Sequence, residues 1–456
     1  MTIVKRLKAF LHLEPLALEL LAGAVPDDHK VRILDMTLER HPMRSLKRLV
    51  RDYDPHLVGI TAYSNQRDRV AECVLAINEN APDAITILGG HHATIMPHDC
   101  QITNLDAIVR GEGCSTFKKI VEALSEGKSS ILKIPNVYDP DGSDFGEVPP
   151  YPGINSLPSP RRDLTDGNKY FCAWSSPNKA AGASIIPRVA AMRTSYGCAY
   201  DCSFCIVPQL CGRKYFPRNI DSIVDELESV DTDYIYLVDD ETFLSPKHML
   251  ELGKKIKERG IKKHFASWAR SNTITKNPDL FRFWREIGLD VVYVGLESTN
   301  EETLKKLNKK ATILQNKEAI RILDECGITL HPAFMVMPDF EAEDFMALSD
   351  YVQSMPPAEA TFTVYSPSPG TTAWTKHKDD FICDPILFYD CMHTILPTKM
   401  PLKDFYRHFS QLTVKAMNRN PLRVKKARVN IFELAKIIWM TGRYIRTQRN
   451  MWRDYS

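Results

Sequence analysis

The sequence YGCAYDCSFC, residues 196–205, places Cys198, Cys202 and Cys205 on one short stretch, with Phe204 just before the last cysteine. Disulfides need thiols in pairs, and a closed tetrahedral zinc site needs four ligands. Three thiolates suit an iron–sulfur cluster that leaves one iron open to a ligand from outside the protein. The stretch therefore predicts a metal cluster, and it makes the chain around it a candidate cofactor-binding domain.

The alternative to a cluster is a zinc knuckle completed by Cys211 or by a histidine. The chain has 11 cysteines, and those outside the three-cysteine stretch are scattered along it. In a chain without an export signal, scattered cysteines are typical of reduced thiols in a cytoplasm. We therefore expect a cytoplasmic protein in which the other thiols are mostly small core residues.

Composition excludes several classes of function. Lys and Arg number 59 against 57 Asp and Glu, and the net charge of +2 gives no support to a nucleic-acid partner. No apolar run has transmembrane length, and the first residues lack the apolar core of a signal peptide. The 456 residues are long enough for about two to four domains around a large buried core.

Residues 1–128 have the pattern of a doubly wound α/β domain. Short apolar runs separated by amphipathic stretches indicate buried parallel strands at 31–35, 57–61, 85–90 and 107–113. Glycines lie at the ends of these runs, where such sheets bind ligands: Gly59, Gly89, Gly90, Gly111 and Gly113. Residues 129–187 are rich in Pro, Gly, Asp and Ser, which predicts a linker between domains.

Residues 188–385 predict a second α/β domain, a partial (βα)6 barrel of the TIM type. Six apolar strand candidates alternate with helical segments, at 188–194, 233–239, 264–269, 291–296, 329–337 and 360–365. In such barrels the carboxyl ends of the strands meet at one rim, where catalytic residues lie. Residues 386–456 are predicted to be mostly helical, and their last part is strongly basic.

Polar residues follow the predicted barrel strands. The cysteine stretch follows the first strand, and the remaining strand ends carry Asp239, Asp240 and Glu241, then Arg270, then Glu297 and Ser298, then MPDF (337–340), then SPSPGTTAW (366–374). Polar residues at one rim of a barrel are common by chance, but three cysteines at the first strand end are not. The rim is therefore the candidate active site.

Each of these polar residues also has an ordinary structural interpretation. One of the three acids at 239–241 could cap the predicted helix that begins at SPKHML (245–250). Arg270 could end a strand in solvent, and Glu297 could pair with Lys305 or Lys306 on the next helix. These alternatives stay open at the level of the sequence.

The cysteine spacing, with an aromatic residue before the third cysteine, resembles the signature of radical S-adenosylmethionine (SAM) enzymes, and the later strand-end motifs follow in the same order. The resemblance implies that Cys198, Cys202 and Cys205 hold a [4Fe–4S] cluster whose fourth iron binds the amino and carboxylate groups of SAM. In that family reductive cleavage of SAM gives a 5′-deoxyadenosyl radical. A reductant protein such as flavodoxin or ferredoxin is then an implied partner.

The same resemblance implies a SAM site around Phe204. Asp240 or Glu241 would accept the SAM amino group, because carboxylates suit an ammonium, while Arg270, Glu297 and Ser298 correspond to positions that hold the carboxylate and ribose. The stretch SPSPGT (366–371) fits the family pattern on the sixth strand. The fifth strand departs from it, since MVMPDFEAED (335–344) stands where the family often has a glycine-rich turn that contacts adenine.

The N-terminal domain resembles the cobalamin-binding domain of a large subgroup of these enzymes. PHLVGITAYSN, ILGGHHATIMP and AIVRGEG follow in that subgroup's order, which implies that Gly89, Gly90 and His92 line cobalamin. There is no DxHxxG motif, so no histidine is offered as a lower cobalt ligand. Only twelve residues precede the stretch LEPL, so we expect either a start upstream of Met1 or a domain without its usual first strand.

Within the subgroup the chain resembles hopanoid C-3 methylases, mainly through FLHLEPLALELL (10–21) and LPTKMPLKDFY (396–406). The resemblance predicts a cobalamin-dependent C-methyltransferase that acts on an unactivated carbon of a lipid, isoprenoid or other polycyclic substrate. One alternative is a radical SAM enzyme that oxidises, cyclises or rearranges its substrate without methylating it. A more distant one is a non-catalytic iron–sulfur protein.

The basic tail predicts a possible contact with the inner face of a membrane. Apolar and basic residues interleave at helical spacing from residue 415 to residue 453, a span with one acidic residue, Glu433. The basic members that flank the predicted apolar stripe are Arg423, Lys425, Lys426, Arg428, Arg443, Arg446 and Arg449. An interfacial helix on anionic lipid would have this pattern, as would a helix packed on the barrel with a solvated basic face.

Overall fold

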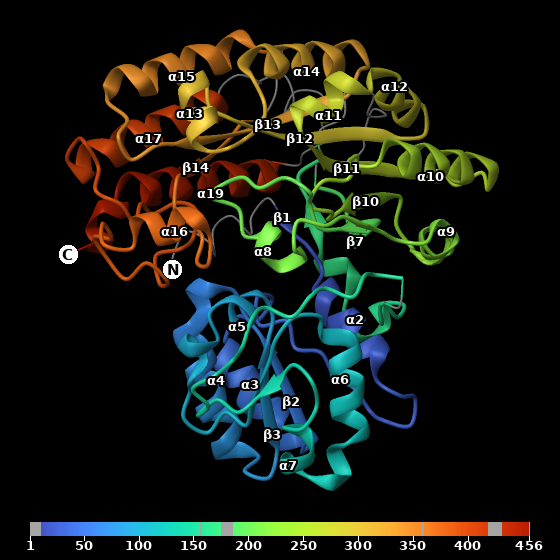
Figure 1. Ribbon diagram of the computed structural model, residues 1–456. Helices are drawn as coiled ribbons and strands as arrows, with labels where there is room; N and C mark the ends of the chain where they lie inside the picture. Colours follow the sequence, from blue (N-terminus) through green and yellow to red (C-terminus); the bar gives the residue numbers. More distant parts are fainter. Residues whose placement is uncertain (1–10, 156, 175–185, 357–359, 418–430, 456) are drawn as a thin grey trace.

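The computed structural model describes residues 11–155, 157–174, 186–356, 360–417 and 431–455. Figure 1 shows an N-terminal α/β domain below a larger unit, in which a parallel sheet is covered by helices. The short strands β1 (Leu11–His12) and β6 (Phe171–Cys172) pair antiparallel where the chain passes between the two units. No helix among the described residues is long and apolar enough to cross a bilayer.

The N-terminal sheet has the strand order β2-β3-β4-β5. The strands β2 (Leu57–Thr61), β3 (Ile85–Gly89) and β4 (Ala107–Val109) are parallel, and β5 (Val137–Tyr138) adds an antiparallel edge. Helices cover both faces, because alternate strand residues point to opposite sides. The helices α3 (Pro42–Tyr53) and α4 (Arg67–Asn80) pack on one face, and α6 (Gly113–Glu122) packs on the other.

The strand expected at residues 31–35 is absent, so that prediction was wrong. The segment has no partner in the sheet and is followed by a turn, in which the backbone N–H of Thr37 donates to Asp35 Oδ1 at 2.8 Å. Local hydrogen bonds from an aspartate side chain compete with strand pairing. The expected strands at 57–61, 85–90 and 107–113 are present, and β2 forms the edge of the described sheet.

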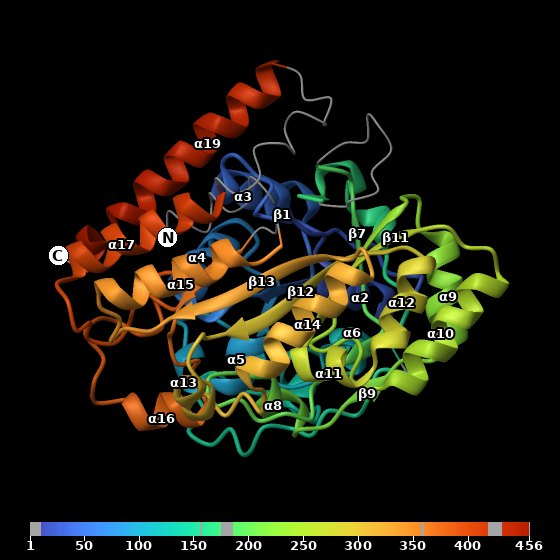
Figure 2. The ribbon, with the colours of Figure 1, turned by 90° about the horizontal axis from the view of Figure 1, so that it is seen from above.

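The second unit contains all six expected strands in one parallel sheet, a curled half-barrel with the order β7-β10-β11-β12-β13-β14. Their bounds are β7 (Ala190–Met192), β10 (Tyr234–Leu237), β11 (His264–Ala269), β12 (Leu289–Glu297), β13 (Thr329–Val336) and β14 (Thr361–Val364). The helices between them include α9 (Ile220–Ser229), α10 (Pro246–Glu258), α12 (Pro278–Glu286), α14 (Ile313–Glu325) and α15 (Ala342–Ser354). Figure 2 shows these helices from above.

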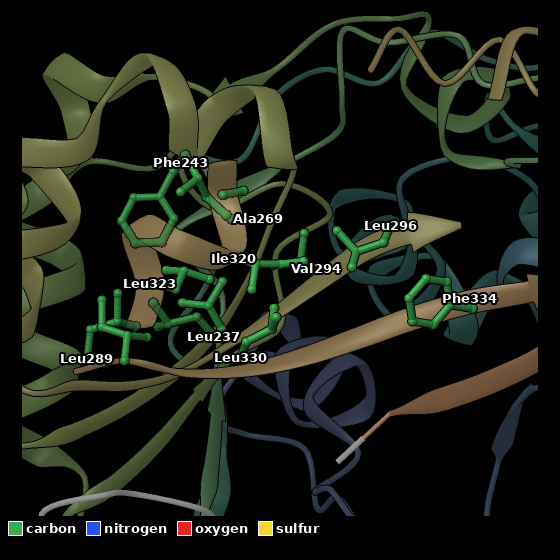
Figure 3. Close-up of a cluster of buried hydrophobic side chains, with 14 of the residues drawn as sticks. Leu237, Phe243, Ala269, Leu289, Val294, Leu296, Ile320, Leu323, Leu330 and Phe334 are labelled. Atoms are coloured by element: carbon green, nitrogen blue, oxygen red, sulfur yellow. The ribbon is translucent and has the colours of Figure 1, made fainter. Parts of the chain in front are cut away.

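The main hydrophobic core lies between this sheet and its outer helices. Figure 3 shows Leu237 of β10, Val294 of β12 and Leu330 of β13 in one cluster with Leu323 of α14. Burying one such side chain fully stabilises the fold by about 1.5–3 kcal/mol. The opposite, concave face is different, because it carries polar aromatic residues in a row: Tyr236, Trp268, Tyr293 and His331.

Helices dominate the C-terminal region, as expected from residue 386 onward. After the short α16 (Thr372–His377), the helix α17 (Leu402–Met417) packs against α15 and α19 (Ile431–Arg449), and a 3-10 turn closes the chain at Met451–Tyr455. Phe405 and Phe409 of α17 are fully buried in this packing. Figure 2 shows α15, α17 and α19 side by side. The basic residues Arg423, Lys425, Lys426 and Arg428 lie outside the described residues.

A buried ion-pair network ties the stretch LEPLALELL to the half-barrel. Arg162, from the segment predicted as a linker, contacts Glu14, lies 2.6 Å from Glu226 of α9 and lies 3.6 Å from Glu19. Glu19 belongs to α2 (Leu16–Ala24), and burial raises the pKa of its carboxyl group. Because Glu14 also accepts the backbone N–H of Ala191 in β7 at 2.7 Å, this network fixes the edge of the barrel sheet.

The two units meet at the short helix α5 (His91–Ile95), which follows β3 and contacts α8 (Val207–Cys211) just beyond the cysteine loop. Gly370, in the segment that follows the sixth barrel strand, has φ +80°, and a Cβ there would overlap Ile95. On another side of the interface, Arg67 of α4 lies 3.2 Å from Asp384. The carboxyl edge of the N-terminal sheet therefore faces the rim of the half-barrel.

Gly370→Ala should destabilise the protein more than Gly327→Ala. Both glycines have positive φ, but a Cβ at Gly327 meets no atom within 4 Å, whereas one at Gly370 overlaps Ile95. The backbone strain alone costs about 1–2 kcal/mol, and forced overpacking adds about 1–3 kcal/mol. Urea unfolding of the two variants measures the difference. Equal losses would contradict a tight contact between Gly370 and α5.

Candidate functional site

The cysteine loop is held at the rim of the half-barrel by backbone hydrogen bonds. It begins at Gly197, whose φ of +85° favours glycine and whose N–H donates to Asp240 Oδ2 at 2.8 Å. The N–H of Ser203, between the second and third cysteines, donates to Leu307 O at 3.0 Å. Asn308 Nδ2 donates to Asp201 O at 3.0 Å. The loop is thus tied to the end of the second strand of the half-barrel and to the turn at Leu307–Asn308, between β12 and α14.

The three thiols are close enough to interact electrostatically. Cys202 is buried, and Cys198 and Cys205 are partly buried. Burial, with a smaller contribution from the other thiols of the loop, raises the pKa of Cys198 to about 11 and that of Cys205 to about 12. Without a positive partner these thiols are therefore protonated at neutral pH. Iron would supply the charge that makes thiolates favourable.

The structure does not support a zinc knuckle. Among the described residues, no group of three or more His, Cys, Asp or Glu side chains is arranged to hold a single metal ion. Cys211 is buried, and its Sγ lies 3.7 Å from the carbonyl oxygen of Cys198, to which it is directed. A cluster spreads its ligands over several irons, so it suits coupled thiols that do not converge on one point. The donor set fits a [4Fe–4S] cluster held by Cys198, Cys202 and Cys205.

The three acids after β10 have three different environments. Asp239 accepts the backbone N–H groups of Thr194 and Ser195 at 2.7 and 2.8 Å, and burial raises its pKa to about 6. Asp240 is exposed and accepts the N–H of Gly197. None of them caps α10, because Ser245 is the cap of that helix. Asp239 and Asp240 therefore shape the cysteine loop.

Glu241 is the acid with a free acceptor. It is 2% exposed, and its Oε1 has no hydrogen-bond partner among the described residues. Burial raises the pKa of Glu241 to about 7, although Thr273 donates a hydrogen bond to it. Its charge also raises the pKa of Cys198, so the two groups are neighbours. An unpaired buried carboxylate oxygen beside the cluster loop fits an amino group of a bound cofactor.

Arg270 is buried, which contradicts its placement in solvent. It lies at the end of β11, and its Nη1 donates to the Sγ of Cys202 at 3.3 Å. Its guanidinium carbon lies 3.8 Å from the centroid of the Tyr200 ring. Burial acts to lower the pKa of Arg270, but the nearby Cys202 thiol and Glu241 outweigh it, and the pKa is raised. The guanidinium of Arg270 therefore contacts two residues of the cysteine loop, Cys202 and Tyr200.

Glu297 ends β12 with φ +62° and accepts a hydrogen bond from Lys309 Nζ at 2.7 Å. The expected partners were Lys305 and Lys306, but both are exposed. The pair lies over Gly295, where a Cβ would overlap the Glu297 carboxylate and come within 2.9 Å of Lys309 Nζ. Ser298 is buried, and its Oγ accepts the N–H of Asn300 at 3.1 Å. Gly295 thus makes room for a buried ion pair at the rim.

Phe204 is partly buried and packs against an apolar cluster at the rim, which includes Met335, Tyr365 and Ile395. These residues come from β13, the end of β14 and the segment after α16. The aromatic residue before the third cysteine therefore anchors the cysteine loop to the fifth and sixth strand ends of the barrel. The neighbours of Phe204 in this cluster are hydrophobic, so they do not identify which residues of the fifth strand would contact adenine.

The carboxyl edge of the N-terminal sheet carries the residues expected at cobalamin. Gly89 ends β3, and Gly90 has φ +103°, where a Cβ would come within 2.5 Å of Thr61 Oγ1. His92 points into its own domain, since its Nδ1 lies 3.0 Å from Ser64 Oγ and its ring borders a small cavity with Leu88 and Cys100. Burial lowers the pKa of His92, so its ring is neutral.

Tyr63 and His91 form an aromatic pair at this edge. Their ring centroids are 5.9 Å apart, and Tyr63 is 67% exposed. Burial and Arg193 lower the pKa of His91, while Asp240 acts in the opposite direction. Because Arg193 and Asp240 belong to the barrel rim, His91 lies at the junction of the two units. Sequence reasoning passed over Tyr63, whose only signal is its position two residues after a predicted strand.

Sequence reasoning also missed Tyr200, Asn308 and Lys309. Tyr200 lies inside the cysteine stretch, but nothing in the spacing separates it from a surface residue. Asn308 has φ +51°, which asparagine tolerates better than most residues, and this is the one local signal that the segment forms a tight turn. Lys309 is a buried lysine in a run of exposed ones, and only its contacts distinguish it.

Comparison with known proteins agrees with this geometry. The family model for the radical SAM superfamily matches residues 192–352, and the model for the B12 binding domain matches residues 4–121. The chain is 29% identical to the hopanoid C-3 methylase of Methylococcus capsulatus over 407 residues, which cover 88% of this chain and 75% of that protein. The matched regions include the cysteine loop, the half-barrel and the glycine-ended sheet.

Two solved structures share the fold. The radical SAM methyltransferase TsrM from Kitasatospora setae, with cobalamin and a [4Fe–4S] cluster bound, aligns with a TM-score of 0.64 and 18% identity over 92% of this chain and 88% of that chain. The cobalamin-dependent radical SAM enzyme OxsB, with aqua-cobalamin and SAM bound, aligns with a TM-score of 0.70 and 14% identity over 98% and 70%. At these identities the likeness establishes the architecture.

Fold and site together define an enzyme that combines a [4Fe–4S] cluster and SAM with cobalamin. The chain belongs to the cobalamin-binding subgroup of the radical SAM superfamily. The expected half-barrel, the N-terminal B12 domain and the helical C-terminal region are confirmed.

Replacing Cys198, Cys202 or Cys205 with Ala should abolish the [4Fe–4S] cluster, because each thiolate ligates one iron. Cys211→Ala should keep it, since Cys211 contacts a backbone carbonyl within the loop and not the other thiols. Iron and sulfide analysis after anaerobic reconstitution measures the outcome. Loss of iron in the Cys211 variant, with one member of the triplet dispensable, would overturn the ligand assignment.

Proposed function

We propose that this protein is a C-methyltransferase that acts on an unactivated carbon of a lipid, isoprenoid or other polycyclic substrate. The observation that carries the proposal is the contact between α5 and α8, which brings the glycine-ended edge of the B12 domain against the cysteine loop. When bound, the cluster with SAM supplies a radical that removes hydrogen from carbon, and cobalamin supplies the methyl group. The protein brings the cluster with SAM and the cobalamin to one substrate carbon, and it excludes water from the site.

The concave face of the half-barrel supports an apolar substrate. Trp268 of β11 stacks on Tyr293 of β12 at 4.9 Å between centroids, and Tyr293 meets His331 of β13 edge-on at 4.7 Å. Trp268 is 36% exposed although its strand is in the middle of the sheet, so this face is open at that level. Two residues further toward the rim, Ala333 is small, while the Glu297–Lys309 ion pair covers its neighbour Gly295. Aromatic rings beneath a small residue suit a bulky, flat, apolar molecule.

The substrate class rests on similarity as well. The relative named above is a hopanoid methylase, and hopanoids are polycyclic lipids. The stretches that first suggested this likeness have structural roles in this chain, since Glu14 and Glu19 belong to the Arg162 network and Phe405 and Tyr406 are fully buried. They therefore support the fold of this subgroup more strongly than a particular substrate, and the proposal names a class of substrate only.

For SAM, we assign the amino group to Glu241. Asp240, the other candidate, is exposed and already accepts the N–H of Gly197. Oε1 of Glu241 is buried and unpaired among the described residues, so it is preorganised to accept an N–H. Glu297 with Lys309, and Ser298, remain candidates for the carboxylate and ribose. For cobalamin, the backbone at Gly89 and Gly90 and the ring of Tyr63 are better placed than the inward-facing imidazole of His92.

Glu241→Gln should weaken SAM binding by about 10- to 100-fold, because a hydrogen bond to a charged group contributes about 1.5–3 kcal/mol. The raised pKa of about 7 adds a pH dependence. Below pH 7 the wild-type carboxyl group is protonated and affinity should fall, whereas the Gln variant should show no such change. Titration of reconstituted protein with SAM at pH 6 and pH 8 measures both effects.

Asp240→Asn serves as the control for this assignment, because it changes the neighbouring acid without touching the buried acceptor. It should alter SAM affinity less than Glu241→Gln. A larger loss in the Asp240 variant, with Glu241→Gln unchanged, would return the role to Asp240.

Methyl transfer is tested with SAM that carries a labelled methyl group. Reconstituted holoenzyme, a polycyclic triterpenoid and a low-potential reductant should give labelled product together with 5′-deoxyadenosine. The proposal includes a protein reductant, so flavodoxin or ferredoxin should replace the chemical one. Formation of 5′-deoxyadenosine with substrate converted but unmethylated would favour an oxidising, cyclising or rearranging enzyme. No 5′-deoxyadenosine under any condition would point to a non-catalytic iron–sulfur protein.

We also propose that the C-terminal helix α19 contacts an anionic membrane. Ile438 and Trp439 are 63% and 61% exposed, and the guanidinium of Arg443 lies 5.2 Å from the Trp439 ring. Arg446 and Arg449 follow on the last turn. Exposed apolar and aromatic side chains beside arginines match the chemistry of a lipid surface, where each basic residue contributes about 1 kcal/mol. Tyr444 and Gln448 are buried, so the opposite side of the helix packs on the protein.

The protein should sediment with anionic vesicles at low salt and be released at high salt, because salt screens the arginines. The double variant Ile438→Asn, Trp439→Ser should bind about tenfold more weakly. Leu314→Ser is the matched control, since Leu314 is 76% exposed on α14, away from this basic helix. Wild-type protein that ignores anionic vesicles at low salt would remove the proposed membrane contact.

A further inference from the structure

The guanidinium of Arg270 is held on every side. Nη1 donates to Cys202 Sγ at 3.3 Å, Nη2 donates to the carbonyl oxygen of Lys309, and Nε donates to Asn272 Oδ1 at 3.3 Å. The ring of Tyr200 stacks beneath it at 3.8 Å. Arg270 is only 7% exposed. The side chain therefore has one orientation, and that orientation aims a cation at one sulfur.

The surrounding backbone is built to keep it there. Asn308 and Lys310 both have positive φ, 51° and 53°, which turns the intervening Lys309 carbonyl toward the guanidinium. Asn272 Nδ2 donates to the hydroxyl of Tyr200 at 2.8 Å and to Lys310 O at 3.3 Å. Non-glycine residues at positive φ are strained and persist where the surroundings impose them, often at functional sites. The two strained residues here flank one contact, between the Lys309 carbonyl and the guanidinium of Arg270.

A buried cation needs a negative partner. Arg270 forms no ion pair with a carboxylate within 4.0 Å among the described residues, and the atom it faces is the sulfur of Cys202. A hydrogen bond from a cation to a ligating thiolate stabilises negative charge on the cluster. A reduced cluster carries one more negative charge than an oxidised one, so the contact favours reduction.

We propose that Arg270 is a positioning residue of the iron–sulfur site, where it donates to the thiolate of Cys202 and raises the reduction potential of the cluster, and that Tyr200 and the Lys309 carbonyl fix it in that role. This replaces the expected role of Arg270 at the SAM carboxylate. The inference rests on the cluster and not on methyl transfer, so it stands or falls independently of the proposed substrate.

The test is an anaerobic redox titration of the reconstituted cluster, followed by electron paramagnetic resonance in the absence of SAM. Arg270→Gln should keep iron and sulfide but make reduction at least tenfold less favourable, which lowers the one-electron potential by about 59 mV or more. Arg270→Lys keeps the charge without the fork geometry and should shift the potential less. Arg213→Gln is the matched control: Arg213 is exposed and lies 3.6 Å from Asp201 of the same loop, so its charge is screened by solvent.

Two further measurements separate this role from the alternatives. Tyr200→Leu removes the ring under Arg270 and should lower the potential in the same direction as Arg270→Lys. SAM affinity should stay within about twofold of wild type in Arg270→Lys. If Arg270→Lys and Tyr200→Leu both keep the wild-type potential, the proposal is wrong, even where Arg270→Gln fails to hold a cluster. Loss of SAM affinity with an unchanged potential would place Arg270 at the SAM carboxylate instead.

Discussion

The structure depends on how the cysteine loop is tied down. Burial raises the pKa of the Cys198 and Cys205 thiols, which makes both unfavourable as thiolates until iron arrives, so the loop must be held in place by other means. It does so through backbone hydrogen bonds to Asp240 and to Leu307 O, and through Asn308, which binds Asp201. One of these partners follows β10, and the other two lie in the turn between β12 and α14. The half-barrel therefore serves as a frame whose rim positions one loop.

The same frame gives three neighbouring acids three roles. Asp239, Asp240 and Glu241 are consecutive, yet one caps the backbone after β7, one holds Gly197 in its turn, and one keeps an unpaired oxygen in a buried position. Burial raises the pKa of Asp239 and Glu241, and only for Glu241 is the cost of burial not offset by complete hydrogen bonding. An incompletely paired buried carboxylate is costly, which is why it indicates a ligand site.

Short segments and single side chains make the contact between the two units. Gly370 leaves room for Ile95, and Arg67 reaches Asp384, so the B12 domain meets the barrel through the cysteine loop's own helix α8 and the segment that follows the sixth strand. A cofactor at the edge of one sheet is thereby brought to the rim of the other. The arrangement explains why residues of the SPSPGT stretch matter to both units.

The sequence by itself determined the six barrel strands and the position of the three-cysteine loop after the first of them, because thiol spacing and the alternation of apolar runs are local properties. It misjudged residues 31–35, since an apolar run becomes a strand only when a neighbour pairs with it. It also could not place Arg270 on Cys202, choose Lys309 over Lys305 and Lys306 as the partner of Glu297, or distinguish Glu241 from Asp240. Those outcomes depend on burial and on contacts between segments far apart in the chain, and only the tertiary structure decides them.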